Sequence, residues 1–176
     1  MDDIESQREL LEQIIRKVVE KETTRYFNAG IPVGISARHL HVTQEHLEVL
    51  FGKGAQLHPI KELMGGQYAA KERVTLVGTN LRVIENVRIL GPVRSGTQVE
   101  VAKTDAIRLG INPPIRESGD TAKSAPITLV GPNGALFLDE GCIVAKRHIH
   151  MSPEDAAEYG VVDNENVSVK LGGERQ

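Results

Sequence analysis

The sequence predicts a mainly β fold, built as small barrels or a sandwich and preceded by one amphipathic helix. After Gly30, short apolar runs rich in Val and Ile alternate with Gly, Pro and Asn, which is typical of short strands joined by turns. Aromatic residues make up 3% of the chain and Trp is absent, so the core must be aliphatic. The segment 74–78 (VTLVG) is echoed at 127–131 (ITLVG), and 37–43 (ARHLHVT) is echoed at 146–152 (KRHIHMS). The second echo is the stronger one, because it repeats a rare residue at fixed offsets, and together they indicate two related β units.

The predicted helix covers residues 2–22 and has one apolar face. Its opposite face is charged, so the helix is amphipathic rather than buried all round. Two interpretations stay open: the helix packs on its own domain or a partner subunit, or it docks as a peptide in a groove of a larger assembly. The apolar face is formed by Ile4, Leu10, Leu11, Ile14, Ile15, Val18 and Val19.

The β-type runs follow one another closely along the rest of the chain. Three short helices interrupt them, over 43–50, 104–109 and 152–159, and Thr43 and Ser152 have the character of helix N-caps. The β-type runs cover 31–35, 74–77, 81–84, 87–90, 98–101, 127–130, 135–138, 141–145 and 167–171.

Composition and charge exclude several classes of function. The 176 residues suffice for one ordinary domain or two small ones, and 21 basic against 24 acidic side chains give a net charge of −3. The chain has no excess of basic residues that would favour binding to nucleic acid or to an anionic membrane surface. It also has no apolar run long enough to span a bilayer. The acidic N-terminus lacks the pattern of a secretion signal. Cys142 is the single cysteine, which fits a reducing, cytoplasmic compartment.

Four of the six histidines form two His-x-His pairs, and these pairs predict a metal site. The pairs are His39 with His41 and His148 with His150, and each pair follows an arginine. Side chains two apart on a strand lie on the same face, about 6.6 Å apart along the chain, so two imidazoles can converge on one ion. We interpret the two pairs as facing each other across a site shared by the two β units.

The residues that follow the pairs leave alternatives open. His39-x-His41-x-x-x-Glu45 resembles the first half of a cupin motif, and Glu154 follows the second pair at the same spacing. Both carboxylates also suit the first turn of a helix, where they satisfy backbone N–H groups, and we interpret them in this way. A cupin-like metal-dependent enzyme and a non-catalytic structural metal module are the competing classes.

The two remaining histidines and the cysteine have simpler interpretations. His46 and His58 are interpreted as ordinary solvated or hydrogen-bonded side chains. Cys142 is interpreted as a buried packing residue rather than a nucleophile, because no base adjoins it in the sequence.

Three further segments are specific enough to indicate a family. They are ISARHLHV at 35–42, GPVRSGTQVE at 91–100 and AKRHIHM at 145–151. In these segments the chain resembles the PduL-type phosphotransacylases, the phosphate propanoyltransferases of bacterial microcompartments and their free-standing relatives. The resemblance implies two small β-barrels with short capping helices. It also implies the reaction acyl-CoA + phosphate ⇌ acyl phosphate + CoA, with a propanoyl or acetyl group.

The resemblance implies two zinc ions and assigns their ligands by position. The first zinc would be held by His39, His41 and Glu100, and the second by His148 and His150. Zinc with an open position can stabilise a departing CoA thiolate as a Lewis acid.

The remaining roles also come from the resemblance. Arg94 would be the catalytic residue that holds phosphate, and its planar guanidinium suits two parallel hydrogen bonds to that anion. Direct transfer is expected, because no activated Ser or Cys stands out in the sequence. The contacts with the substrate CoA would be Ser36, Lys61, Arg88 and Leu90.

The same resemblance divides the chain. Residues 1–27 would be the N-terminal helix, 28–47 with 122–176 a discontinuous first barrel, and 48–121 the second barrel. The family continues beyond the end of this chain with a further histidine for the second zinc. We therefore expect an incomplete first barrel and a weakly held second zinc. We also expect a homo-oligomer in the cytoplasm, with residues 1–24 as a candidate address for a microcompartment shell protein.

Overall fold

The structure, a computed structural model, describes residues 11–19 and 38–168. The chain divides into two units, Met1–Ile35 with Glu165–Gln176 and Ser36–Asn164. Within the first unit, residues 11–19 are helical, and the apolar side chains of this helix are 50–58% exposed. The rest of the predicted amphipathic helix lies outside the described residues. None of the described helices is long and apolar enough to cross a membrane.

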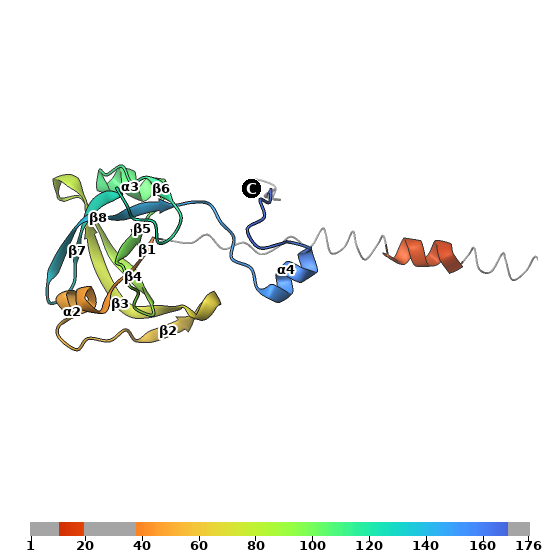
Figure 1. The fold of residues 1–176 in the computed structure, drawn as a ribbon, viewed down its shortest axis with the longest axis horizontal. Coiled ribbons are helices and arrows are strands. Elements are labelled where there is room, and N and C mark those ends of the chain that lie inside the picture. Colours follow the sequence, from red (N-terminus) through yellow and green to blue (C-terminus); the bar gives the residue numbers. More distant parts are fainter. Residues whose placement is uncertain (1–10, 20–37, 169–176) are drawn as a thin grey trace, which may run out of the picture. The chain divides into compact units, whose positions relative to one another are not determined.

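Six strands in the described part of the second unit close into a barrel (Figure 1). In chain order they are β1 (His39–His41), β3 (Tyr68–Val77), β4 (Val83–Gly91), β5 (Gln98–Glu100), β7 (Ala125–Val130) and β8 (Ala135–Ala145). Around the barrel the order is β3, β4, β1, β5, β8, β7 and back to β3. The junctions β1·β4 and β5·β8 are parallel, and the other four are antiparallel.

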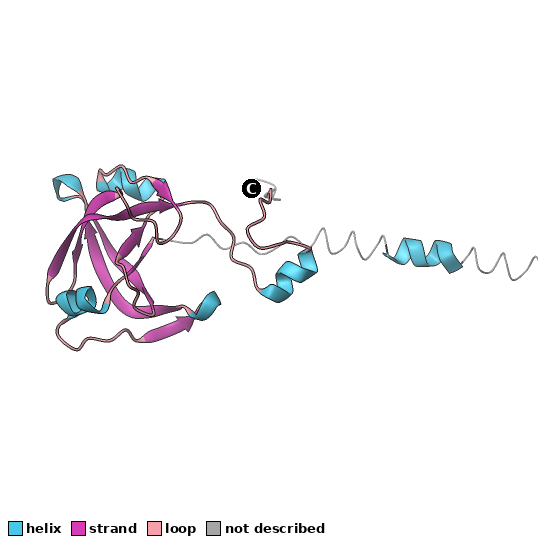
Figure 2. Cartoon of the chain, in the orientation of Figure 1, coloured by secondary structure: helices cyan, strands magenta, loops and turns pink. Residues whose placement is uncertain are grey.

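Shorter elements border the barrel, whose main component is strand (Figure 2). The helices follow the predicted stretches closely. Thr43 Oγ1 accepts a hydrogen bond from the His46 backbone N–H at 3.1 Å, and Ser152 Oγ accepts one from Asp155 at 3.1 Å, so both predicted N-caps are confirmed. The bordering elements are α2 (Gln44–Phe51), β2 (Pro59–Glu62), η1 (Met64–Gly66), η2 (Thr79–Leu81), α3 (Lys103–Leu109) and β6 (Ile115–Arg116), and α4 (Pro153–Tyr159) follows β8 in the chain.

The barrel consists of two equivalent halves, which accounts for the echo of 74–78 at 127–131. The first half is β1, α2, β3 and β4, and the second is β5, α3, β7 and β8. Equivalent strands pair with each other across an approximate two-fold axis: Leu40 lies opposite Val99, and Leu76 lies opposite Leu129. The parallel junction β1·β4 corresponds to β5·β8 in the same way. The segments 74–78 and 127–131 therefore belong to two halves of one barrel. The echo of 37–43 at 146–152 does not follow this division, because the counterpart of β1 is β5 and residues 146–152 lie in a loop.

Strands from both predicted barrels take part in this one barrel. The range 48–121 supplies β3, β4 and β5, whereas β1, β7 and β8 come from the ranges 28–47 and 122–176. Residues 48–121 therefore do not close a barrel by themselves in this structure. The parallel junctions that join the ranges are short and link segments far apart in the chain, so local periodicity gives no sign of them. A second barrel stays a prediction.

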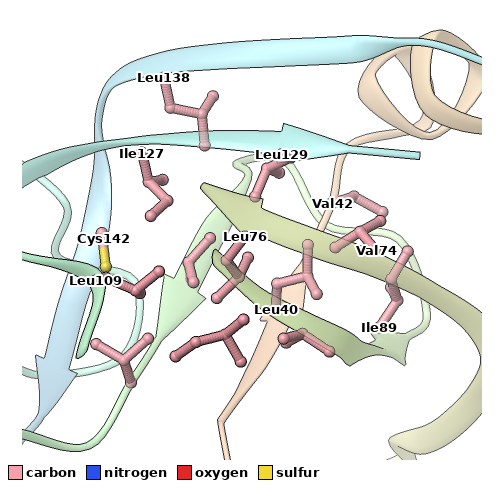
Figure 3. Close-up of a cluster of buried hydrophobic side chains, with 14 of the residues drawn as sticks. Leu40, Val42, Val74, Leu76, Ile89, Leu109, Ile127, Leu129, Leu138 and Cys142 are labelled. Carbon is pink, nitrogen blue, oxygen red and sulfur yellow. The ribbon is translucent and has the colours of Figure 1, made fainter. Parts of the chain in front are cut away.

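The barrel interior is aliphatic, as the composition predicts (Figure 3). The paired leucines Leu76 and Leu129 are fully buried, and so is Leu40 on the short strand β1. Leu109 of α3 joins the same cluster. Cys142 is also fully buried there, and burial raises the pKa of its thiol to about 12. The interpretation of this cysteine as a packing residue is confirmed.

Two glycines let the capping helices approach the barrel closely. Each glycine ends one copy of the repeated segment. A Cβ atom on Gly78 would lie 2.1 Å from the carbonyl oxygen of Leu109 in α3, and one on Gly131 would lie 2.4 Å from that of Leu50 in α2. Because the opposing atoms belong to the backbone, no side-chain rotation could relieve the overlap. Close helix packing thus gives the repeated glycine a physical reason.

Gly131→Ala is expected to lower the free energy of unfolding by about 1–3 kcal/mol, because α2 must move away from the barrel to admit the methyl group. Denaturant unfolding measures this change. Gly96→Ala is the matched control, since a Cβ atom there meets nothing within 4 Å. The control should change stability by less than about 0.5 kcal/mol. Equal stabilities of the two variants would contradict the packing argument.

Candidate functional site

Strand β1 carries the first histidine pair. Leu40 is fully buried in the core, so its two neighbours share the other face of the strand. The rings of His39 and His41 lie edge to face, with their centroids 5.3 Å apart. The antiparallel partner strand β5 places Glu100 opposite His39, and the distance from His39 Nε2 to Glu100 Oε2 is 3.5 Å.

These three side chains form a group that could bind a metal ion. One ligand atom each from His39, His41 and Glu100 lies within 4.8 Å of the others, and no second group of this kind occurs in residues 11–19 and 38–168. His41 Nδ1 is 3.1 Å from the Leu90 carbonyl oxygen, so Nδ1 carries the proton and Nε2 is the acceptor. Burial, and next the charge of Arg94, lowers the pKa of His41 to about 4. The ring is therefore neutral at pH 7, the form that binds metals.

Gln98 holds the carboxylate of Glu100 in place. Both residues lie on the same face of β5, and Gln98 Nε2 donates to Glu100 Oε1 at 2.6 Å. The other carboxylate oxygen is the one nearest His39. Gln98 Oε1 accepts a hydrogen bond from the Gly119 backbone N–H at 2.6 Å, which fixes the end of the amide that faces Glu100. Both side chains are buried, so this geometry has little freedom.

Ser118 connects Arg94 to the same hydrogen-bond network. Ser118 Oγ accepts from Gln98 Nε2 at 3.0 Å and from Arg94 Nη1 at 3.4 Å. Arg94 Nη2 donates to Gln67 Oε1 at 3.1 Å. Burial lowers the pKa of the Arg94 guanidinium, while the charge of Glu100 opposes this shift, and the group stays a cation. Both of these hydrogen-bond partners are neutral, so the positive charge of Arg94 can serve an anion.

The second histidine pair lies in a loop. Strand β8 ends at Ala145, and the next residues have no regular structure, so the predicted placement of this pair on a strand is wrong. The rings nevertheless converge: the Nε2 atoms of His148 and His150 are 3.1 Å apart and the ring centroids 4.7 Å apart. His148 Nδ1 is 2.6 Å from the Lys146 carbonyl oxygen. Both rings are exposed.

A pocket of about 380 Å³ adjoins this second pair. Its lining includes Met64 and Gln67 from the segment before β3, and His150 and Ser152 from the segment after β8. Gln67 also accepts the hydrogen bond from Arg94, so one side chain borders the pocket and contacts the network around the first pair.

The residues expected to contact CoA are brought together in part. Arg88 lies opposite His39 in the β1·β4 register, and the Leu90 carbonyl holds the other ring of the first pair. Lys61 is exposed on β2. Ser36 lies outside the described residues.

Three polar residues of this network were not indicated by the sequence. Gln98 stands two residues before Glu100, so the two-residue period of a strand could have marked it as a neighbour. Gln67 and Ser118 come from separate loops, and their contacts with Arg94 depend on the fold.

The carboxylates of the cupin-like spacing lie elsewhere. Glu45 and Glu154 are exposed in the first turns of α2 and α4, as interpreted from the sequence. Neither belongs to the three-residue group around His39. The carboxylate that lies beside the first pair is instead Glu100 of β5.

Comparison with known proteins identifies the family. The family model described as phosphate propanoyltransferase matches residues 32–176. The chain is 58% identical over 172 residues to the phosphate propanoyltransferase of Lachnoclostridium phytofermentans, covering 98% of this chain and 81% of the relative. For the enzyme of Thermotoga maritima the identity is 54% over 157 residues, with 89% and 74% covered. For that of Priestia megaterium it is 48% over 171 residues, with 96% and 78% covered. The chain belongs to the phosphate propanoyltransferase family of acyltransferase enzymes.

Proposed function

We propose that this chain transfers the propanoyl group of propanoyl-CoA to phosphate, giving propanoyl phosphate and CoA, in a zinc-dependent direct transfer. One observation carries the proposal: Arg94 is joined through Ser118 and Gln98 to the metal-binding group around Glu100. A guanidinium with neutral partners suits an incoming phosphate. A metal site beside it suits a thioester whose leaving group becomes an anion.

The donor set of the first group fits zinc. Two imidazole nitrogens and one carboxylate oxygen are a combination found in catalytic zinc sites, which keep one position open. His41 is neutral with its proton on Nδ1, and Glu100 is fixed through Gln98. Bound here by His39, His41 and Glu100, zinc would supply Lewis-acid stabilisation of the CoA thiolate.

Arg94 would orient phosphate toward the thioester carbonyl. A phosphate oxygen attacks the carbonyl carbon, and as that C–O bond forms the C–S bond breaks, so CoA leaves as the thiolate. Phosphate is already nucleophilic, so the protein mainly aligns the reactants, and alignment can supply up to about 7–11 kcal/mol. The burial of Cys142 and the raised pKa of its thiol support transfer without an acyl-enzyme.

A second zinc ion is proposed at His148 and His150. Two ligands on a tetrahedral ion with bonds of about 2.0 Å lie about 3.3 Å apart. The separation of 3.1 Å between the two Nε2 atoms supports such a shared ion. The adjoining pocket, which includes Gln67, is the proposed place for the acyl group or phosphate.

The remaining parts of the proposal concern CoA and partners. Ser36, Lys61, Arg88 and Leu90 are proposed to contact CoA, with Lys61 pairing with a CoA phosphate. We also propose a homo-oligomer, a second barrel, and an interaction of residues 1–24 with a microcompartment shell. The exposed apolar side chains of the helical stretch support a docking role for that segment.

An assay of CoA release from propanoyl-CoA tests the function. We expect release that requires phosphate, stops with a metal chelator and returns when zinc is added. Acetyl-CoA in the same assay measures the acyl preference. Release that is independent of phosphate would indicate a thioesterase and contradict the proposal, as would activity that persists after complete metal removal.

Gln98→Leu is expected to weaken zinc binding about 10- to 100-fold, because Glu100 loses the donor that orients it. Competition with a chromophoric chelator measures the affinity. Gln44→Leu is the matched control. The Gln44 side-chain amide donates hydrogen bonds at the exposed end of α2, to Glu48 Oε1 and to the Ala55 carbonyl oxygen. Equal zinc affinities of the two variants would show that Gln98 does not orient the ligand.

A further inference from the structure

We propose that His46 is a positioning residue that holds the Arg94 loop, residues 92–97 between β4 and β5, in the geometry that binds phosphate. The proposal rests on the proposed role of Arg94 and extends it to a residue outside the hydrogen-bond network described above. His46 acts through Thr97, the last residue of the loop.

The Arg94 loop is fastened at two points to the segment where β1 leads into α2. The Arg94 backbone N–H donates to the Val42 carbonyl at 2.9 Å. Thr97 Oγ1 accepts from the Thr43 backbone N–H at 3.0 Å and lies 2.7 Å from His46 Nδ1. The loop therefore takes its position from the same segment that carries the first histidine pair.

His46 is itself held firmly. Its backbone N–H donates to Thr43 Oγ1, the N-cap of α2. The helix is anchored by Leu47 and Leu50, both fully buried against the barrel. The imidazole is half-buried and bonds to Thr97 at a distance typical of a short, well-formed hydrogen bond. The helix therefore gives the ring a fixed base from which it holds Thr97.

An equivalent of the contact between His46 and Thr97 occurs in the other half of the barrel, so the contact follows from the repeated architecture of the fold. In the other half, Arg38 Nη2 lies 3.0 Å from Asp105 Oδ1. Arg38 precedes β1 as Thr97 precedes β5, and Asp105 is the third residue of α3 as His46 is of α2. In each half, the first turn of the helix therefore holds the residue that leads into the first strand of the opposite half. Only the contact made by His46 belongs to the loop that carries Arg94.

Loss of this contact has a specific expected effect. The Arg94 side chain would keep its hydrogen bonds to Gln67 and Ser118, and the metal ligands would keep their strands. The backbone of the loop would lose its fixed distance from the metal site, and small misplacements of a positioning group cost up to about 100-fold. We expect KM for phosphate to rise about tenfold in His46→Leu, with KM for propanoyl-CoA and zinc content unchanged.

The test compares four variants by steady-state kinetics and thermal unfolding. Thr97→Val removes the hydroxyl with little change of shape and should reproduce the effect of His46→Leu, whereas Thr97→Ser should restore a KM close to that of the parent. Thr79→Val is the control, since it also removes a threonine hydrogen bond, from Thr79 Oγ1 to the Gly110 carbonyl at 2.6 Å. The control should lower stability without changing KM for phosphate.

A double variant separates this proposal from the proposed role of Arg94. If His46 acts through Arg94, adding His46→Leu to Arg94→Ala causes little further rise of KM for phosphate. If the two effects multiply, His46 has an independent role and the inference is overturned. It is equally overturned if Arg94→Ala raises KM but His46→Leu and Thr97→Val do not. If Arg94→Ala itself leaves phosphate kinetics unchanged, the proposed function fails at that residue, whatever the His46 variants show.

Discussion

Arg94→Ala is expected to lower kcat/KM for phosphate by about 100-fold or more. The side chain offers two N–H donors and a positive charge whose two hydrogen-bond partners, Gln67 and Ser118, are neutral. Removal of one preorganised donor from a catalytic site typically costs about 100- to 1,000-fold. Initial rates of CoA release over a range of phosphate concentrations, at saturating propanoyl-CoA, measure the loss.

Arg94→Lys separates charge from shape. Lysine keeps the charge but cannot form two parallel hydrogen bonds to phosphate, so we expect a partial recovery of activity. Arg82→Ala is the matched control. The Arg82 guanidinium is exposed and donates to the Ile107 carbonyl at 3.3 Å, and its loss should leave phosphate kinetics unchanged. Equal kinetics of the Arg94 and Arg82 alanine variants would remove Arg94 from the proposed mechanism.

Much of the local structure was predictable because it depends on residues that are close together in the sequence. The helix starts at Thr43 and Ser152 follow from side chains that cap the backbone within three residues. The aliphatic core follows from composition, and the alternation of His39, Leu40 and His41 follows from the two-residue period of a strand. These features need no knowledge of which segments meet.

The closure of the barrel was not predictable in the same way. The echoed segments indicated two units, but nothing local shows that Leu76 and Leu129 lie directly opposite each other on paired strands. The parallel junctions depend on contacts between distant short segments. The second histidine pair was mispredicted for a similar reason. Its His-x-His spacing is compatible with a strand, but strand β8 ends at Ala145, before the pair begins.

The candidate site also has some features that local spacing predicts and others that depend on the fold. The spacing of His39 and His41 predicts that two imidazoles converge, whereas the choice of Glu100 as their neighbour depends on the antiparallel register of β1 and β5. The polar side chains around Arg94 come from loops that meet in the folded chain. A carboxylate chosen by spacing alone would have been Glu45, which is exposed on α2.

His39→Ala is expected to remove one equivalent of zinc per chain and to reduce activity at least about 100-fold. A site with two protein ligands left, His41 and Glu100, binds zinc far more weakly than one with three. Elemental analysis after gel filtration in a zinc-free buffer measures the stoichiometry. Glu100→Gln tests the same site with little change of shape, and it should also lose the metal, because a neutral amide replaces the carboxylate.

His58→Ala is the matched control for metal loss. His58 Nδ1 lies 2.7 Å from Glu72 Oε1, so it too is a histidine beside a carboxylate. Within the described ranges, however, no third ligand joins that pair. We therefore expect the control to keep its zinc and the His39 variant to lose it, with circular dichroism showing that both retain the fold. Full zinc content in a folded His39→Ala protein would exclude this residue as a ligand, because three donors converging at one point, rather than a histidine near a carboxylate, are what the metal requires.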